Sequence, residues 1–312
     1  IGIKSGSVPI ANLDEARELA RLDRDAGVLA IRDAGSPVPY PELDDEPDLP
    51  RLARAGRHLA PARRYLRGVA IDCTAAELPA AAAEQAKRGN GWVKLVGDWI
   101  DRETGDLGPT YDAATLAAAV DAAHSAGARV AVHTFSETAV AAVVAAGVDS
   151  VEHGTGLSVD LIDQMARQGT ALVPTMINIA TFDDIATQAD AKFPTYAAHM
   201  RALKLRFPEV VRAAHEAGVR ILCGTDAGGG IDHGLAAEEM LLLHEQAGMS
   251  ADAVLRAGSW EARDWLGFGP RVSGDDPGHA LGDLTVYDAD PRLDLRVLRE
   301  PSRIVLRGKV IR

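Results

Sequence analysis

Three side chains that can bind a divalent metal stand where apolar runs of the sequence end. His133 follows RVAV, His153 follows VDSVE, and Asp226 follows ILCGT. Imidazole and carboxylate groups are ligands for zinc and related metals. One such residue alone is more often a hydrogen-bonded structural group or a helix cap. Three of them at the ends of successive runs predict a metal site.

A lysine inside another apolar run points to the same region. Lys94 lies within WVKLV, and a buried ammonium group needs a partner to offset its lost hydration. Asp33 and Asp72 also end apolar runs. We therefore expect these side chains to share one end of the elements that carry them.

The runs belong to a repeated pattern of a helix-like segment, a glycine and a short apolar or β-branched segment. The glycine suits the left-handed position that closes a helix, and the run after it is short enough for a buried strand. Helix starts are also marked. Asn12 with Glu15 resembles a capping box, and Asp112, Ser136 and Ser158 are predicted N-caps.

Strands alternating with helices predict right-handed βαβ units and a parallel sheet. The fold class is therefore α/β, a (β/α)8 TIM-like barrel, in which chemistry sits at the carboxyl ends of the strands. Seven strands are visible, and the first strand is expected upstream of residue 1, because the first visible element is the helix near residues 12–26. The predicted strands lie within residues 25–33, 66–72, 92–96, 125–134, 145–153, 167–175 and 216–226.

The C-terminal end has a different pattern. Residues 283–287 and 303–311 alternate apolar and polar side chains, which predicts antiparallel strands. We therefore expect a barrel over residues 1–280 and the C-terminal part of a small β-sandwich over residues 281–312. The acidic, proline-rich residues 37–50 are expected to form a solvated loop.

The composition limits the classes of molecule that this protein is expected to bind. The net charge of −12 argues against nucleic acid, whose phosphates need a basic surface. No apolar run approaches the roughly 20 residues of a membrane span. Cys73 and Cys223 stand in no cluster, which is typical of reduced thiols in a cytoplasmic protein. We expect a small-molecule substrate; self-association and a leader before Ile1 stay open.

The sequence resembles the amidohydrolase superfamily, in its imidazolonepropionase-like and prolidase-type branch. The matching phrases run in family order over nearly the whole chain. They are IRDAG (31–35), VKLVG (93–97), VAVHT (130–134), SVEHGTG (150–156), LVPTM (172–176), GTDAG (224–228), HG (233–234) and LGDLTVYDADP (281–291).

The resemblance implies a role for each strand-end residue. Lys94 matches a carbamylated lysine that bridges two divalent metals, with zinc as the expected ion. His133 and His153 match ligands of the second metal. Asp226 matches the aspartate that binds the first metal and shuttles protons, and Asp33 matches an aspartate that we interpret as structural. A carbamylated Lys94 is anionic, which would resolve the problem of a buried cation.

One part of the family pattern is missing. The family's first strand ends in His-x-His, and no such motif occurs in this sequence. We expect it upstream of residue 1, on the strand that the count leaves out. The alternative is a divergent chain with one metal or none.

The implied reaction is hydrolysis of an amide or peptide-type C–N bond in a dipeptide or an N-acyl amino acid. A metal-activated hydroxide would attack, and Asp226 would carry its proton to the leaving amine. Trp99, Asn178 and His233 are the substrate candidates, although loop packing or a local turn would explain each as well.

Two other interpretations stay open. A mononuclear cyclic-amide hydrolase or deaminase on the same barrel would need no lysine at position 94. A metal-poor relative would not be an enzyme at all. The metal content of the purified protein separates these alternatives.

Overall fold

The centre of the molecule is a curved parallel sheet, seen in the computed structural model, which describes residues 1–269 and 282–312. The sheet continues through a parallel bridge between Ala55 and Trp92 to a second pair of parallel strands. The six strands of the central sheet, in spatial order, are β12 (Ala171–Val173), β11 (Ser150–His153), β10 (Arg129–Thr134), β7 (Trp92–Val96), β5 (Leu59–Ala60) and β6 (Ile71–Asp72). The second pair of strands is β3 (Ala30–Asp33) with β4 (Arg51–Arg54).

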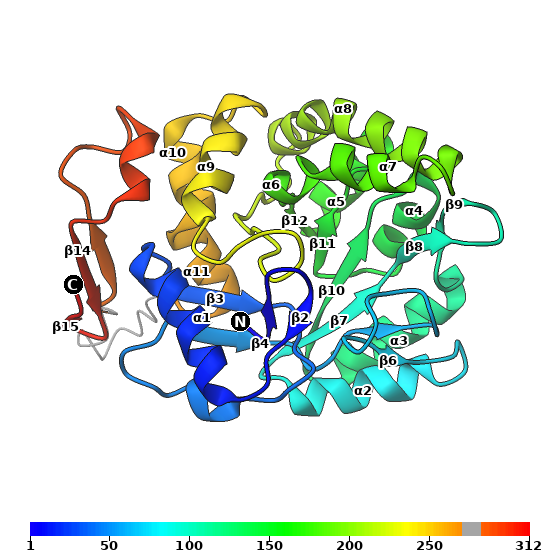
Figure 1. Cartoon of the computed structure of the whole chain (residues 1–312), viewed down its shortest axis with the longest axis horizontal. Helices are drawn as coiled ribbons and strands as arrows, with labels where there is room; N and C mark the ends of the chain where they lie inside the picture. Colours follow the sequence, from blue (N-terminus) through cyan, green and yellow to red (C-terminus); the bar gives the residue numbers. More distant parts are fainter. Residues whose placement is uncertain (270–281) are drawn as a thin grey trace.

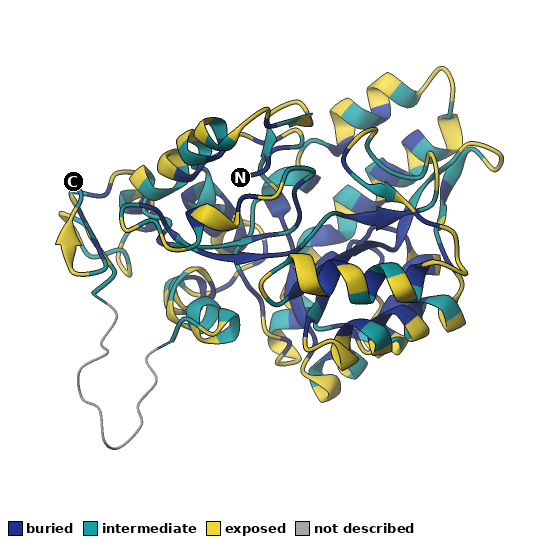
Figure 2. Cartoon of the chain, turned by 90° about the horizontal axis from the view of Figure 1, so that it is seen from below, coloured by how far each residue is buried: buried dark blue, intermediate teal, exposed yellow. Residues whose placement is uncertain are grey.

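Helices surround these strands, with their apolar faces turned inward (Figures 1 and 2). The predicted caps form, since the side chains of Asn12, Asp112, Ser136 and Ser158 each accept a backbone N–H at the start of a helix. The helices are α1 (Leu13–Asp25), α2 (Leu78–Arg88), α3 (Ala113–Ser125), α4 (Glu137–Ala145), α5 (Val159–Gln168), α6 (Met176–Ile179), α7 (Phe182–Ala189), α8 (Pro194–Glu216), α9 (Ala236–Glu245), α10 (Ala251–Gly258) and α11 (Trp260–Leu266). The α/β, TIM-like barrel prediction is confirmed.

The expected strand at residues 66–72 is wrong for most of its length. Only Ile71–Asp72 forms a strand, at the edge of the sheet, and the Asp72 side chain is exposed. Its expected place in the barrel belongs to β4, which pairs with β3 along its whole length. The arginines that begin and end β4 hid this strand from pattern reading, because each has a carboxylate partner in the fold.

Residues 37–50 are not a solvated loop. Tyr40, Leu43 and Leu49 are fully buried against Ala16 and Ala20 of α1, and a short 3-10 helix spans Pro41–Leu43. The acidic residues between them are exposed or half-buried, and Asp44 and Glu46 pair with Arg54 and Arg17. This packing closes one side of the barrel.

The last predicted barrel strand is shorter than expected. Residues 220–225 join the sheet only through a parallel bridge between Leu172 and Ile221. Beyond that point the N–H of Cys223 donates to the carbonyl of Ala257 instead of to β12. The chain leaves the sheet there and turns toward Asp226.

Two hairpins were not predicted. The pair β1 (Ile3–Lys4) and β2 (Val8–Pro9) precedes α1, so the helix near residues 12–26 is not the first element. The pair β8 (Asp98–Asp101) and β9 (Asp106–Pro109) follows β7. Both hairpins are short, which leaves little sequence pattern to detect.

The C-terminal strands form as predicted. The strands β13 (Leu284–Val286), β14 (Arg303–Leu306) and β15 (Lys309–Val310) pair antiparallel, and a 3-10 helix at Leu295–Arg299 lies between the first two. The expected boundary between residues 280 and 281 lies outside the described residues, so the division into two domains stays a prediction. Within the described ranges no helix has both the length and the apolar surface to cross a membrane.

Candidate active site

Two histidines meet at the carboxyl ends of neighbouring strands. The rings of His133 on β10 and His153 on β11 lie edge to face, with centroids 4.7 Å apart. Both side chains are buried. Burial, with the positive charge of Lys94 nearby, holds the pKa of His133 well below its usual range and lowers that of His153 to about 3. Both rings are therefore neutral, as a metal ligand must be.

The backbone of His153 turns its side chain toward His133. In the sheet register His153 lies beside Thr134, whereas His133 lies beside Glu152, so simple alternation would put the two histidines on opposite faces. His153 has φ +67°, a left-handed conformation that redirects its side chain. Thr175 and Asp226 also have positive φ. Such conformations cost of order 1–3 kcal/mol each and gather at functional sites.

The ring of His153 is fixed from behind. Its Nδ1 lies 2.7 Å from the hydroxyl oxygen of Thr175. This contact leaves the other ring nitrogen for a ligand, which is how a second residue orients a metal-binding imidazole. The Nε2 of His133 is buried without a hydrogen-bond partner among the described residues. The nearest carboxylate, that of Asp98, lies 3.7 Å away, beyond hydrogen-bond distance.

Lys94 lies on the same face of the sheet as His133, one layer nearer the start of the strands. It stands beside Ala131 in the register, so its side chain shares a face with His133 two residues further along β10. Lys94 is buried, and its pKa is lowered by that burial although Glu152 and Asp226 act against the shift. Arg32 pairs with Glu152 and bonds Ser150 Oγ at 2.8 Å, so Glu152 already has a full cationic partner.

Asp226 follows the last barrel segment, beyond the bridge between Leu172 and Ile221. Its side chain is accessible, yet the surrounding protein withholds enough water to raise its pKa, with Lys94 acting against the shift. The amide nitrogen of Asn178 donates to Asp226 Oδ2 at 2.9 Å. Asn178 therefore orients the carboxylate, so the structure gives it a position beside the site rather than a remote turn.

Aromatic rings cover His133. Trp99 packs against His133 with ring centroids 5.5 Å apart. The ring centroid of Tyr65 lies 4.9 Å from that of Trp99 and 5.8 Å from that of His133. His58 stacks on Tyr65 at 5.1 Å. The sequence did not predict Tyr65 or His58, because the two-residue strand β5 that lies between them carries no recognisable pattern.

Two of the expected residues are engaged in other contacts. His233 contacts Asp23 Oδ2 through one ring nitrogen and the carbonyl of Ile3 through the other, both at 3.0 Å. Its polar atoms are thus occupied by the protein. Asp33 accepts a hydrogen bond from Gly35 and one from the Tyr40 hydroxyl, which supports its structural interpretation.

Buried carboxylates outside the predicted set support the site. Glu239 on α9 accepts the backbone N–H groups of Met176 and Ile177 at 2.9 and 2.8 Å. It thereby anchors the turn that carries Thr175 and Asn178. Asp98 accepts the backbone N–H groups of Phe135 and Ser136, two and three residues after His133. Neither residue ends a predicted strand, so the strand-end criterion could not find them.

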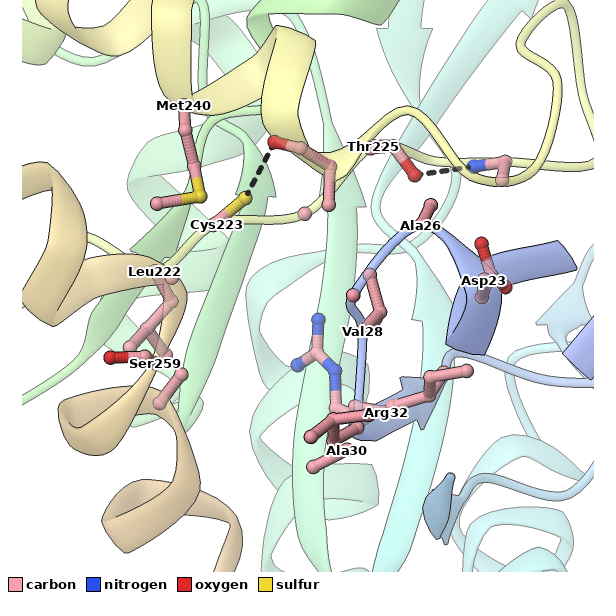
Figure 3. Close-up of a pocket in the computed structure, with 18 of the residues that line it drawn as sticks. Asp23, Ala26, Val28, Ala30, Arg32, Leu222, Cys223, Thr225, Met240 and Ser259 are labelled. Atoms are coloured by element: carbon pink, nitrogen blue, oxygen red, sulfur yellow. Dashed lines mark hydrogen bonds between the residues drawn. The ribbon is translucent and has the colours of Figure 1, made fainter. Parts of the chain in front are cut away.

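A cavity of about 940 Å³ opens beside these residues. His153, Asp226, Tyr65 and His58 are among the residues that line it. It extends between β3 on one side and residues 222–227 on the other, and Figure 3 shows Arg32 and Val28 facing Leu222, Cys223 and Thr225 across it. Of the predicted metal ligands, His153 and Asp226 line this cavity.

The donors at this site fit a metal ion only if Lys94 contributes. Among residues 1–269 and 282–312, no three His, Cys, Asp or Glu side chains are grouped to hold a metal ion. The neutral imidazoles and the unpartnered His133 Nε2 are suitable nitrogen donors. A carbamate on Lys94 would add oxygen donors on the face of the sheet that carries His133.

Comparison with known proteins agrees with the geometry. The model of the amidohydrolase family matches residues 71–311. An uncharacterised protein of Mycobacterium tuberculosis (strain H37Rv) is 51% identical over 307 residues, covering 98% of this chain and 80% of that protein, and one of Mycobacterium bovis matches equally.

Solved structures show the same fold. A Xaa-Pro dipeptidase with methionine bound in its active site superimposes with a TM-score of 0.78 at 24% identity, covering 99% of this chain and 83% of the other. A Bifidobacterium longum protein assigned as a prolidase gives 0.81 at 26% identity, covering 96% and 76%. A prolidase complexed with N-methylphosphonate-L-proline gives 0.77 at 21% identity, covering 97% and 81%. The chain therefore belongs to the amidohydrolase family.

Proposed function

We propose that this protein is a metal-dependent hydrolase that cleaves the amide bond of a dipeptide or an N-acyl amino acid. The observation that carries the proposal is the contact between His133 and His153, two buried neutral imidazoles at adjacent strand ends with Lys94 on the same face. The prolidase and Xaa-Pro dipeptidase neighbours support the substrate class.

His133, His153 and Lys94 as a carbamate would hold the metal, with Asp226 at its edge, and two zinc ions are the expected content. When bound, the metal would lower the pKa of water and polarise a carbonyl group.

Asp226 is the residue that we propose to move the proton. Its accessible carboxylate faces the cavity, and Asn178 engages Oδ2. The other oxygen is then free to accept the proton of the attacking water and to return it to the leaving amine nitrogen. The raised pKa of Asp226 brings the carboxyl group closer to the pH at which such an exchange is efficient.

The test is a turnover screen of dipeptides and N-acyl amino acids before and after chelation. Hydrolysis that stops on metal removal and returns with zinc is the expected result. Calorimetric binding of N-methylphosphonate-L-proline gives a readout independent of turnover. A protein that turns over these amides equally well after complete chelation would contradict the metal-dependent function.

A further inference from the structure

Tyr65 lies over the strand ends on the loop between β5 and β6. Three rings hold its side chain: His58 is stacked on it with an interplanar angle of 26°, and Trp99 and His133 meet it at 61° and 73°. A ring packed on several sides has few accessible rotamers. The position of the phenol is therefore fixed before any ligand arrives.

The hydroxyl group of Tyr65 has no hydrogen-bond partner within residues 1–269 and 282–312, and Tyr65 lines the cavity. Tyr65 is half-buried at the cavity wall, so its hydroxyl is available to a ligand in the cavity. Tyr111 shows the ordinary case, since its hydroxyl donates to the carbonyl of Cys73 at 2.8 Å. The two tyrosines differ in this respect, and of the two only Tyr65 combines a free hydroxyl with contact to His133.

We infer that Tyr65 is a further catalytic residue whose hydroxyl donates a hydrogen bond to the carbonyl oxygen of the scissile amide as that oxygen gains negative charge. The inference rests on the proposed function. The ring touches His133, which puts the hydroxyl at the reacting end of the cavity rather than at its far end near β13. A neutral phenol is a donor at pH 7, because its ordinary pKa is about 10.

The bond changes balance without proton loss from Tyr65. As the water oxygen bonds to the carbonyl carbon, the C=O π pair moves onto the oxygen that Tyr65 contacts. The pair returns when the C–N bond breaks, and the amine nitrogen takes the proton held by Asp226. A donor aimed at a developing oxyanion contributes roughly 10²–10³-fold to turnover.

His58 is the positioning residue in this arrangement. Its ring supports the phenol, while its Nδ1 is buried without a partner among the described residues. A close glycine explains how the ring fits, because a Cβ at Gly35 would lie 2.9 Å from that Nδ1. The role proposed for His58 rests on the stacking of its ring on Tyr65.

The test compares Tyr65→Phe with Tyr111→Phe as the matched control. Tyr65→Phe should lower kcat roughly 10²–10³-fold with KM changed little. It should also weaken calorimetric binding of N-methylphosphonate-L-proline, whose tetrahedral phosphorus mimics the transition state. Tyr111→Phe should lower thermal stability and leave kcat and phosphonate binding unchanged.

His58 variants provide the second arm. His58→Phe keeps a ring and should retain kcat, whereas His58→Ala should lower kcat and add little when combined with Tyr65→Phe. Additive losses would overturn the positioning role. An active wild type whose Tyr65→Phe variant keeps full kcat would overturn the role of Tyr65 alone. A wild type without amide turnover would overturn the proposed function and this inference together.

Discussion

The left-handed backbone of His153 brings its ring to 4.7 Å from that of His133 on the neighbouring strand. In regular strands the two side chains would point to opposite faces, since His153 pairs with Thr134 and not with His133. The fold thus accepts local strain to bring two imidazoles together. Strain of this kind persists only where the surrounding structure holds it, as the contact between His153 and Thr175 does here.

Asp226→Asn is expected to leave the fold intact and to lower kcat by roughly 10²–10⁴-fold, the range for losing a general acid–base group. The asparagine keeps the shape of the side chain but cannot accept the proton. Circular dichroism and steady-state kinetics measure both effects. Asp160→Asn on the exposed start of α5 is the control and should behave like wild type. Turnover near the wild-type rate in Asp226→Asn would remove this residue from the mechanism.

Lys94→Ala is expected to abolish turnover, and a short carboxylic acid such as propionate is expected to restore part of it. Lys94 is buried on the face that carries His133, so a small acid can occupy the space left by the side chain and replace a carbamate. Lys87→Ala on the surface of α2 should show neither the loss nor a response to propionate. Full activity of Lys94→Ala without added acid would show that no carbamate is needed.

Arg32→Met is expected to lower the free energy of unfolding by about 3 kcal/mol, because it leaves Glu152 as a buried carboxylate without its main partner. Both side chains of this ion pair are largely buried, at 9% and 5% exposure. Arg292→Met, which breaks an exposed pair with Asp290, should leave stability nearly unchanged. Urea unfolding measures the difference. Equal stabilities of the two variants would contradict an essential buried pair.

The pH dependence of stability should reveal Glu239. Burial raises the pKa of Glu239 to about 7 from a usual 4.5, although Met176 and Ile177 donate to its carboxylate. The native state therefore binds this proton more tightly than the unfolded state does. The contribution is present below pH 4.5 and is lost as pH rises toward 7. Wild type should lose stability relative to Glu239→Gln over this window, and parallel curves from pH 4.5 to 7 would contradict the shift.

Sequence patterns located the parallel strands that carry His133 and His153 and the places of both residues on them. His133 and His153 were found because each ends a run of apolar residues, and that local signal survives in the fold. The strand at Arg51–Arg54 was missed because its terminal arginines look solvated until Asp44 and Asp283 are placed beside them. Charge pairing across the fold is not a local property of the chain.

The supporting residues could not be predicted for a related reason. Tyr65, Glu239 and Asp98 act through contacts between segments distant in the sequence, such as Glu239 with Met176. No periodic pattern marks them. His233 shows the converse, because its motif suggested a substrate contact, whereas its ring nitrogens contact Asp23 and Ile3. The strand expected before Ile1 concerns residues beyond this chain and stays a prediction.

Metal content tests the central claim most directly. Elemental analysis of the purified, active protein should find about two divalent metal ions per chain, with zinc expected. His133→Asn and His153→Asn should lose metal and turnover together, while His215→Asn, which lies on α8, should keep both. An active wild-type protein that contains no divalent metal would contradict the account.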